Sequence, residues 1–150
     1  MSKLNLLAVA STLLVTALAH AESPLAEPAK SQATVVTLDA APTRAVPSGK
    51  ASIKTLALGK NAFIGQLWLA PGGKVPLHRD ATEEYIYIVS GQGQITIDGT
   101  TSKVGPGTTV YMPANAEVTF QNGDQPLVAI QVFAGPASAK KYEKWPPKAP

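Results

Sequence analysis

Cysteine is absent from this chain of 150 residues, and histidine occurs only twice. Without cysteine the protein can form no disulfide, no thiolate metal site and no cysteine nucleophile. Charged residues make up only 15% of the sequence, which excludes a disordered acidic chain and a coiled coil. Apolar residues reach 45%, so the chain can build one folded domain around a hydrophobic core.

The first 21 residues have the layout of a secretory signal peptide. Lys3 precedes a mostly apolar run at 4–18, and the small-x-small sequence AHA follows at 19–21. A membrane-spanning helix needs about 20 predominantly apolar residues, whereas this run is shorter and includes several polar residues. We therefore predict cleavage after Ala21, export to the periplasm of a two-membrane bacterium, and no membrane attachment afterwards. One histidine leaves with the signal peptide, so the mature protein keeps only His78.

The remaining chain divides by composition into three parts. Residues 22–50 form a leader rich in Ala, Pro, Ser and Thr, in which Thr34–Leu38 is a candidate edge strand. Residues 51–134 carry the pattern of a folded domain, and residues 135–150 form a Pro-rich tail with four lysines. The basic excess lies in this tail and not in a stripe along the domain, so we expect no nucleic-acid partner. We expect a solvated tail, with one helical turn near Lys140–Lys144 and with Trp145 and Pro146-Pro147 docking the tail on the domain.

The central part has the pattern of many short strands. β-branched and aromatic residues fill them, and Gly, Pro, Asn and Asp separate them. The dipeptide Asp98-Gly99 predicts a two-residue hairpin turn. The candidate strands are 52–58, 62–70, 74–79, 84–90, 93–98, 101–104, 108–112, 116–121 and 127–133. Since this part contains no amphipathic helix, we predict an all-β domain of antiparallel strands in a sandwich, barrel or jelly roll.

Three side chains in this part are candidates for a functional site. His78 and Asp80 share one face of a candidate strand because alternate residues of a strand point the same way. By the same rule Glu84 lies on the side of Ile86 and Ile88, which we expect to face inward. An imidazole and two carboxylates that converge on an apolar interior could bind a metal ion or a polar ligand.

The spacing around these residues resembles a signature of the cupin superfamily. Residues 72–91, GGKVPLHRDATEEYIYIVSG, resemble the first cupin signature, G-x5-H-x-H-x3/4-E-x6-G. Residues 99–122 resemble the second signature in outline, through Pro106-Gly107, Pro113 and Asn122. The resemblance spans about residues 52–134. It implies an antiparallel jelly-roll β-barrel, here with an extended N-terminal leader and a C-terminal tail, and it makes a homodimer a candidate assembly.

Many cupins hold a divalent metal with three histidines and one glutamate. By this resemblance His78 matches the first histidine and Glu84 matches the glutamate. Asp80 stands at the second histidine position and Val118 at the third, and valine cannot coordinate a metal. The remaining set of one imidazole and two carboxylates would suit Mn, Fe, Zn or Ni.

Three interpretations therefore remain open. The first is a periplasmic barrel that binds a small polar molecule, a sugar or an organic acid, through His78, Asp80 and Glu84. The second is a metal-dependent enzyme, an oxygenase, isomerase or lyase, in which the same three residues bind the ion. No separate general base can be named from the sequence, so no catalytic residue is assigned. The third is a structural or partner-binding barrel that is packed shut.

Overall fold

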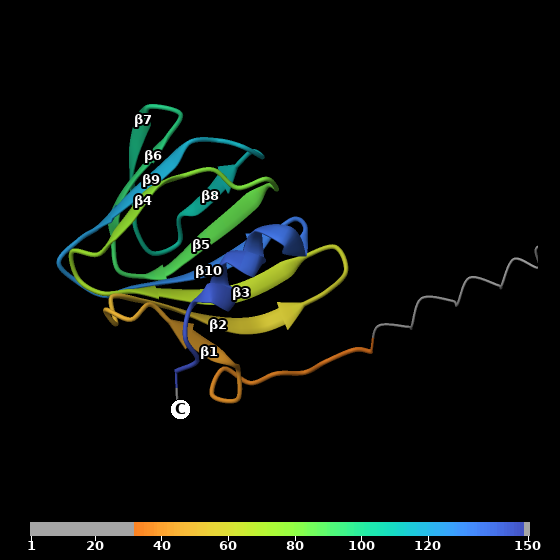
Figure 1. Ribbon diagram of the computed structural model, residues 1–150. Helices are drawn as coiled ribbons and strands as arrows, with labels where there is room; N and C mark the ends of the chain where they lie inside the picture. The colour runs from red at the N-terminus through yellow and green to blue at the C-terminus, as the bar shows by residue number, and fades with distance from the viewer. Residues whose placement is uncertain (1–31, 149–150) are drawn as a thin grey trace, which may run out of the picture. The chain divides into compact units, whose positions relative to one another are not determined.

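The computed structural model describes residues 32–148 (Figure 1). The predicted signal peptide, residues 1–21, and the first part of the leader lie outside the described residues. Among residues 32–148, no helix has both the length and the apolar character needed to cross a membrane.

Two antiparallel sheets make up the domain. The larger sheet has the order β1-β2-β3-β10-β5-β8, with β1 at Thr43–Ala45, β2 at Ala51–Leu58, β3 at Phe63–Leu69, β10 at Leu127–Phe133, β5 at Glu84–Ser90 and β8 at Thr109–Met112. The smaller sheet has the order β4-β9-β6-β7, with β4 at Lys74–His78, β9 at Val118–Asn122, β6 at Gly93–Ile97 and β7 at Thr100–Val104. This arrangement confirms the predicted all-β jelly roll.

The core lies between the two sheets. Buried and partly exposed residues alternate strictly along β3 and β10, because successive side chains of a strand point to opposite faces. The inward residues of the larger sheet pack against Ile95, Val104 and Val118 of the smaller sheet. Burial of these apolar side chains is the main favourable contribution to folding.

The hairpin between β6 and β7 turns at the predicted dipeptide. Ile97 pairs with Thr100, which leaves Asp98 and Gly99 as the two turn residues. Both have positive φ angles, 46° for Asp98 and 81° for Gly99, as this type of two-residue turn requires.

The edge strand of the larger sheet is β1 and not the candidate run Thr34–Leu38. That run forms no strand, and Val35 within it is fully exposed. β1 pairs instead with β2, with Thr43 opposite Lys54, and Ala41 just before it is buried. Strand-forming composition was a poor guide here because a strand also needs a partner and a face to bury.

The C-terminal segment is not the solvated tail that its composition predicted. It folds into a 3₁₀ helix, η1 (Pro136–Lys144), which lies against the larger sheet (Figure 1). Tyr142 of η1 is buried, and Trp145 packs against the core. Arg44 of β1 donates hydrogen bonds to the carbonyl oxygens of Glu143 (3.2 Å) and Trp145 (2.8 Å). The segment can pack in this way because Lys140, Lys144 and Lys148 stay exposed while Tyr142 and Ala139 face the barrel.

Candidate functional site

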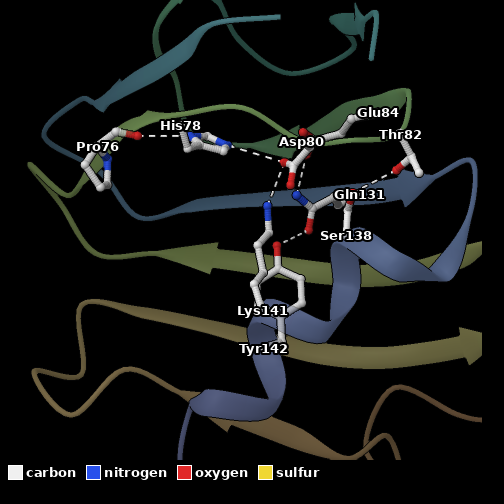
Figure 2. Close-up of polar contacts among 9 residues, drawn as sticks. All are labelled: Pro76, His78, Asp80, Thr82, Glu84, Gln131, Ser138, Lys141 and Tyr142. Atoms are coloured by element: carbon white, nitrogen blue, oxygen red, sulfur yellow. Dashed lines mark hydrogen bonds and ion pairs between the residues drawn. The ribbon is translucent and has the colours of Figure 1, made fainter. Parts of the chain in front are cut away.

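His78 ends β4 and directs its ring toward Asp80 (Figure 2). Its Nδ1 lies 2.9 Å from the carbonyl oxygen of Pro76, which can only accept a hydrogen bond, so Nδ1 carries a proton. Nε2 lies 3.5 Å from Oδ2 of Asp80. The Asp80 carboxylate raises the pKa of His78 above its usual value, despite the opposing effect of burial.

Asp80 follows β4 and makes a second ionic contact. Its Oδ2 accepts a hydrogen bond of 2.7 Å from Nζ of Lys141 in η1. Burial opposes ionisation of this carboxyl group, but the hydrogen bonds from His78 and Lys141 outweigh burial and lower the pKa of Asp80. Asp80 is therefore a carboxylate held between two nitrogen groups.

Glu84 begins β5 and is buried, as its strand parity predicted. Its Oε1 accepts a hydrogen bond from Nε2 of Gln131 on β10. Oε1 of Gln131 in turn accepts a hydrogen bond of 2.5 Å from the hydroxyl of Tyr142. Burial raises the pKa of Glu84, although the Gln131 amide and the Lys141 charge partly offset this effect.

The structure thus brings the three predicted side chains together. One ligand atom from each of His78, Asp80 and Glu84 lies within 4.8 Å of the others. Val118 lies opposite His78 in the β4–β9 pair and is buried, so it adds an apolar wall beside the imidazole. The two neighbours of opposite parity point elsewhere, as expected: Arg79 pairs with Glu117 at 2.7 Å, and Glu83 accepts hydrogen bonds from surface tyrosines.

One feature of the His78, Asp80 and Glu84 cluster favours metal binding, and another disfavours it. The proton on Nδ1 leaves Nε2 of a neutral His78 available as a ligand, and a backbone carbonyl that fixes the ring in this way is common in metal sites. However, Nζ of Lys141 already occupies the space beside Oδ2 of Asp80. As this structure stands, the residues do not fit a divalent ion at full coordination.

A cavity of about 450 Å³ lies between the sheets beside these groups. His78, Glu84, Gln131, Lys141 and Tyr142 contribute polar atoms to its lining. Most of the remaining wall is apolar and comes from both sheets, for example Leu67, Ile88, Ile95, Met112, Val118 and Leu127. The cavity falls in the range of roughly 300–1,000 Å³ that is typical of small-molecule sites.

Sequence reasoning missed three members of the site. Gln131 had a visible signal, since it has the same strand parity as the buried Ala129 and Phe133. Lys141 and Tyr142 lie in the segment taken for a solvated tail. The spacing of three between Ala139, Tyr142 and Trp145 matches the three residues per turn of a 3₁₀ helix and could have indicated a buried face.

Asn122, which closes the second cupin-like motif, has a structural role. Its Nδ2 donates hydrogen bonds to the carbonyl oxygens of Ala70 (2.8 Å) and Gln125 (2.9 Å). These bonds tie the end of β9 to the end of β3 and to the turn before β10.

Comparisons with known proteins agree with this fold. Residues 67–133 match the family model of the cupin domain. An uncharacterized protein of Streptomyces coelicolor is 30% identical over 79 residues, which cover 53% of this chain and 75% of that protein. An RmlC-like cupin from Shewanella frigidimarina has a TM-score of 0.64 at 13% identity, covering 69% of this chain and 92% of its own.

A further solved structure is that of the polyketide cyclase RemF from Streptomyces resistomycificus. Its TM-score is 0.60 at 19% identity, and the match covers 68% of this chain and 79% of that chain. The matched family model, the relative and the jelly-roll topology together show that this chain belongs to the cupin superfamily.

Proposed function

We propose that this protein binds a small organic acid that has an apolar body and a carboxylate head. The observation that supports this proposal is the cavity between the sheets, whose wall is mostly apolar and whose lining at one end includes His78, Gln131 and Lys141. An apolar ligand body gains free energy by leaving water for such a cavity.

The charges along the cavity favour an anionic head group. Lys141 and His78 line the cavity at the end where Glu84 lies, whereas the exposed Lys50 and Lys74 line its other end. Glu84 is the carboxyl group in the lining, and burial raises its pKa, which favours its neutral form. Asp80 compensates the charge of Lys141, and its carboxylate also raises the pKa of His78, which favours a second positive charge at this end of the cavity.

Of the two ligand classes expected from the sequence, the cavity favours the organic acid over the sugar. A sugar carries a hydroxyl on most of its carbons, and each buried hydroxyl without a partner costs about 1–3 kcal/mol. The apolar wall offers few partners for such hydroxyls. A carboxylate needs polar partners only at one end of the molecule.

Calorimetry with a matched set of ligands tests this proposal. We expect saturable binding of medium-chain or aromatic carboxylates, with weaker binding of the corresponding alcohols and of hexoses. Val118→Phe, which fills the cavity, should abolish binding, whereas Val89→Phe at an exposed position should not. If no carboxylate binds the wild-type protein, or if Val118→Phe binds as well as wild type, the proposal is wrong.

A metal-dependent oxygenase, isomerase or lyase is the second candidate. It is favoured by the three ligand atoms within 4.8 Å and by the contact of Nδ1 of His78 with the carbonyl oxygen of Pro76, which leaves Nε2 as the ring atom that faces the carboxylates. Elemental analysis of untagged protein from its native compartment tests this candidate, which predicts a stoichiometric content of Mn, Fe, Zn or Ni. A closed structural barrel, the third interpretation, is disfavoured by the cavity.

We further propose that the protein acts after export, in the periplasm and without membrane attachment, as the signal-like residues 1–21 suggest. The intact mass of protein from a periplasmic extract should correspond to a chain that starts at residue 22. A full-length mass would contradict export by cleavage. The homodimer stays a prediction, which light scattering can test.

A further inference from the structure

Lys141 is held inside the site by the fold of η1 and is not a mobile surface side chain. The residue that follows it, Tyr142, is buried, and so is Ala139 one turn earlier. Nζ of Lys141 lies 4.8 Å from the centre of the Phe133 ring, a distance at which a cation is attracted to the ring face. The backbone around Lys141 therefore has little freedom to withdraw the ammonium group.

The ammonium group of Lys141 occupies the space beside the atoms that would have to bind a metal ion. Oδ2 of Asp80 is 2.7 Å from Nζ of Lys141 and 3.5 Å from Nε2 of His78. A divalent ion bound between His78 and Asp80 would lie about 2.0–2.2 Å from each ligand atom. A divalent cation and an ammonium group cannot share this space, because they repel each other and compete for the same oxygen.

We infer that Lys141 serves as the cation of this site and excludes a divalent metal from His78, Asp80 and Glu84. The inference concerns the same site as the proposed function, but it does not depend on the identity of the organic acid. Val118 strengthens it, since the position opposite His78 offers no fourth donor that could compensate for the loss of Asp80.

The inference also gives Lys141 a place in ligand binding. An ammonium group has three N–H donors, and Asp80 accepts from one of them. Lys141 also lines the cavity, so its other donors are available to the carboxylate of a bound acid. The ammonium group of Lys141 would then bind the carboxylate of the acid. In a metal-containing site, a metal ion would take this role.

Metal titration of two lysine variants tests the inference. Lys141→Met keeps an unbranched apolar side chain against Phe133 and removes the charge. Lys144→Met, on the exposed side of the same helix, is the matched control. With Zn²⁺ and Mn²⁺ in calorimetry, we expect weak binding to wild type and to Lys144→Met, and an affinity at least tenfold higher for Lys141→Met. Adding His78→Ala to Lys141→Met should remove the gain.

The other outcomes overturn the inference. It is wrong if wild type already binds either metal stoichiometrically, or if Lys141→Met gains no affinity. If Lys141→Met does not give the circular dichroism spectrum of a folded β protein, Lys141→Gln replaces it with the same expectations. Failure of every carboxylate to bind, together with a gain of metal affinity in Lys141→Met, would refute the proposed ligand and leave the inference standing.

Discussion

His78 and Val118 face each other across the β4–β9 strand pair, so the position opposite the imidazole is occupied by an apolar side chain. This pairing predicts how a metal site could be restored. In Val118→His a second imidazole should lie beside His78, and Asp80→His should add a third while removing the partner of Lys141. Both substitutions are made in the Lys141→Met background, which removes the competing ammonium group, and we expect each added imidazole to raise Zn²⁺ affinity by roughly tenfold, which corresponds to about 1.4 kcal/mol.

Calorimetry with the single and double variants measures this effect. Val89→His, at an exposed position on β5, controls for adventitious binding by an added histidine. Equal affinities for Lys141→Met and for the double variant in that background would show that this side of the barrel is not arranged to surround an ion.

The hydroxyl of Tyr142 should contribute to stability through Gln131. In Tyr142→Phe the buried Oε1 of Gln131 loses its donor, and an unpaired buried acceptor costs about 1–3 kcal/mol. Urea unfolding should show this loss, whereas Tyr87→Phe, at an exposed tyrosine, should change the free energy of unfolding by less than about 0.5 kcal/mol. Equal stabilities of the two variants would contradict the buried hydrogen-bonded chain.

The pKa of Glu84 predicts a dependence of stability on pH. Burial raises this pKa above the usual 4.5 of a glutamate. The folded protein then binds the Glu84 proton more tightly than the unfolded chain, so this contribution to stability is complete below the unfolded pKa and is lost as pH rises through the folded pKa. In Glu84→Gln the residue stays neutral and can still accept the Gln131 hydrogen bond.

We therefore expect Glu84→Gln to raise the melting temperature relative to wild type at pH 8 and to leave it nearly unchanged at pH 4. A gain of 1 kcal/mol would correspond to about 4 °C for a domain of this size. Glu143→Gln on the exposed side of η1 is the control and should show no such difference. A destabilised Glu84→Gln at pH 8 would mean that the site requires the charge.

The hydrogen bonds of Arg44 should hold the C-terminal segment in place. Arg44→Ala removes two donors to the carbonyl oxygens of Glu143 and Trp145. We expect faster trypsin cleavage after Lys140, Lys141 or Lys144, detected by mass spectrometry, because local opening exposes these sites. Arg79→Ala removes an exposed ion pair with Glu117 and should leave the cleavage rate unchanged. Unaltered cleavage in Arg44→Ala would show that the other contacts of the segment hold it in place without Arg44.

Local patterns predicted the barrel well. Strand-forming composition located the runs 62–70 and 127–133, which contain β3 and β10, and Asp98-Gly99 gave the β6–β7 turn, because these features depend on neighbours in sequence. Parity also placed Glu84 inward, whereas Asp80 lies beyond the end of β4, so its position beside His78 depends on the loop between β4 and β5. Local patterns alone did not distinguish a sandwich, a barrel and a jelly roll. The cupin-like spacing predicted the jelly-roll topology.

The residues that the C-terminal segment adds to the site could not be predicted from local sequence patterns. Composition assigned Lys141 to a solvated tail, since four lysines and several prolines follow residue 134. Its ionic contact with Asp80 spans 61 positions in the sequence and depends on the packing of Tyr142 against the barrel. The edge strand was misplaced for a related reason, because pairing of β1 with β2 is decided by tertiary contacts and not by the β-branched run at 34–38.

The position of η1 after the last strand sets the order in which the site is completed. Chain synthesis proceeds from the N-terminus, so all the strands of the barrel leave the ribosome before Lys141 and Tyr142 do. Until η1 docks, Asp80 and Gln131 lack the partners that Lys141 and Tyr142 provide. A change that unfolds η1 would therefore remove the counter-charge of Asp80 without altering any strand of the barrel.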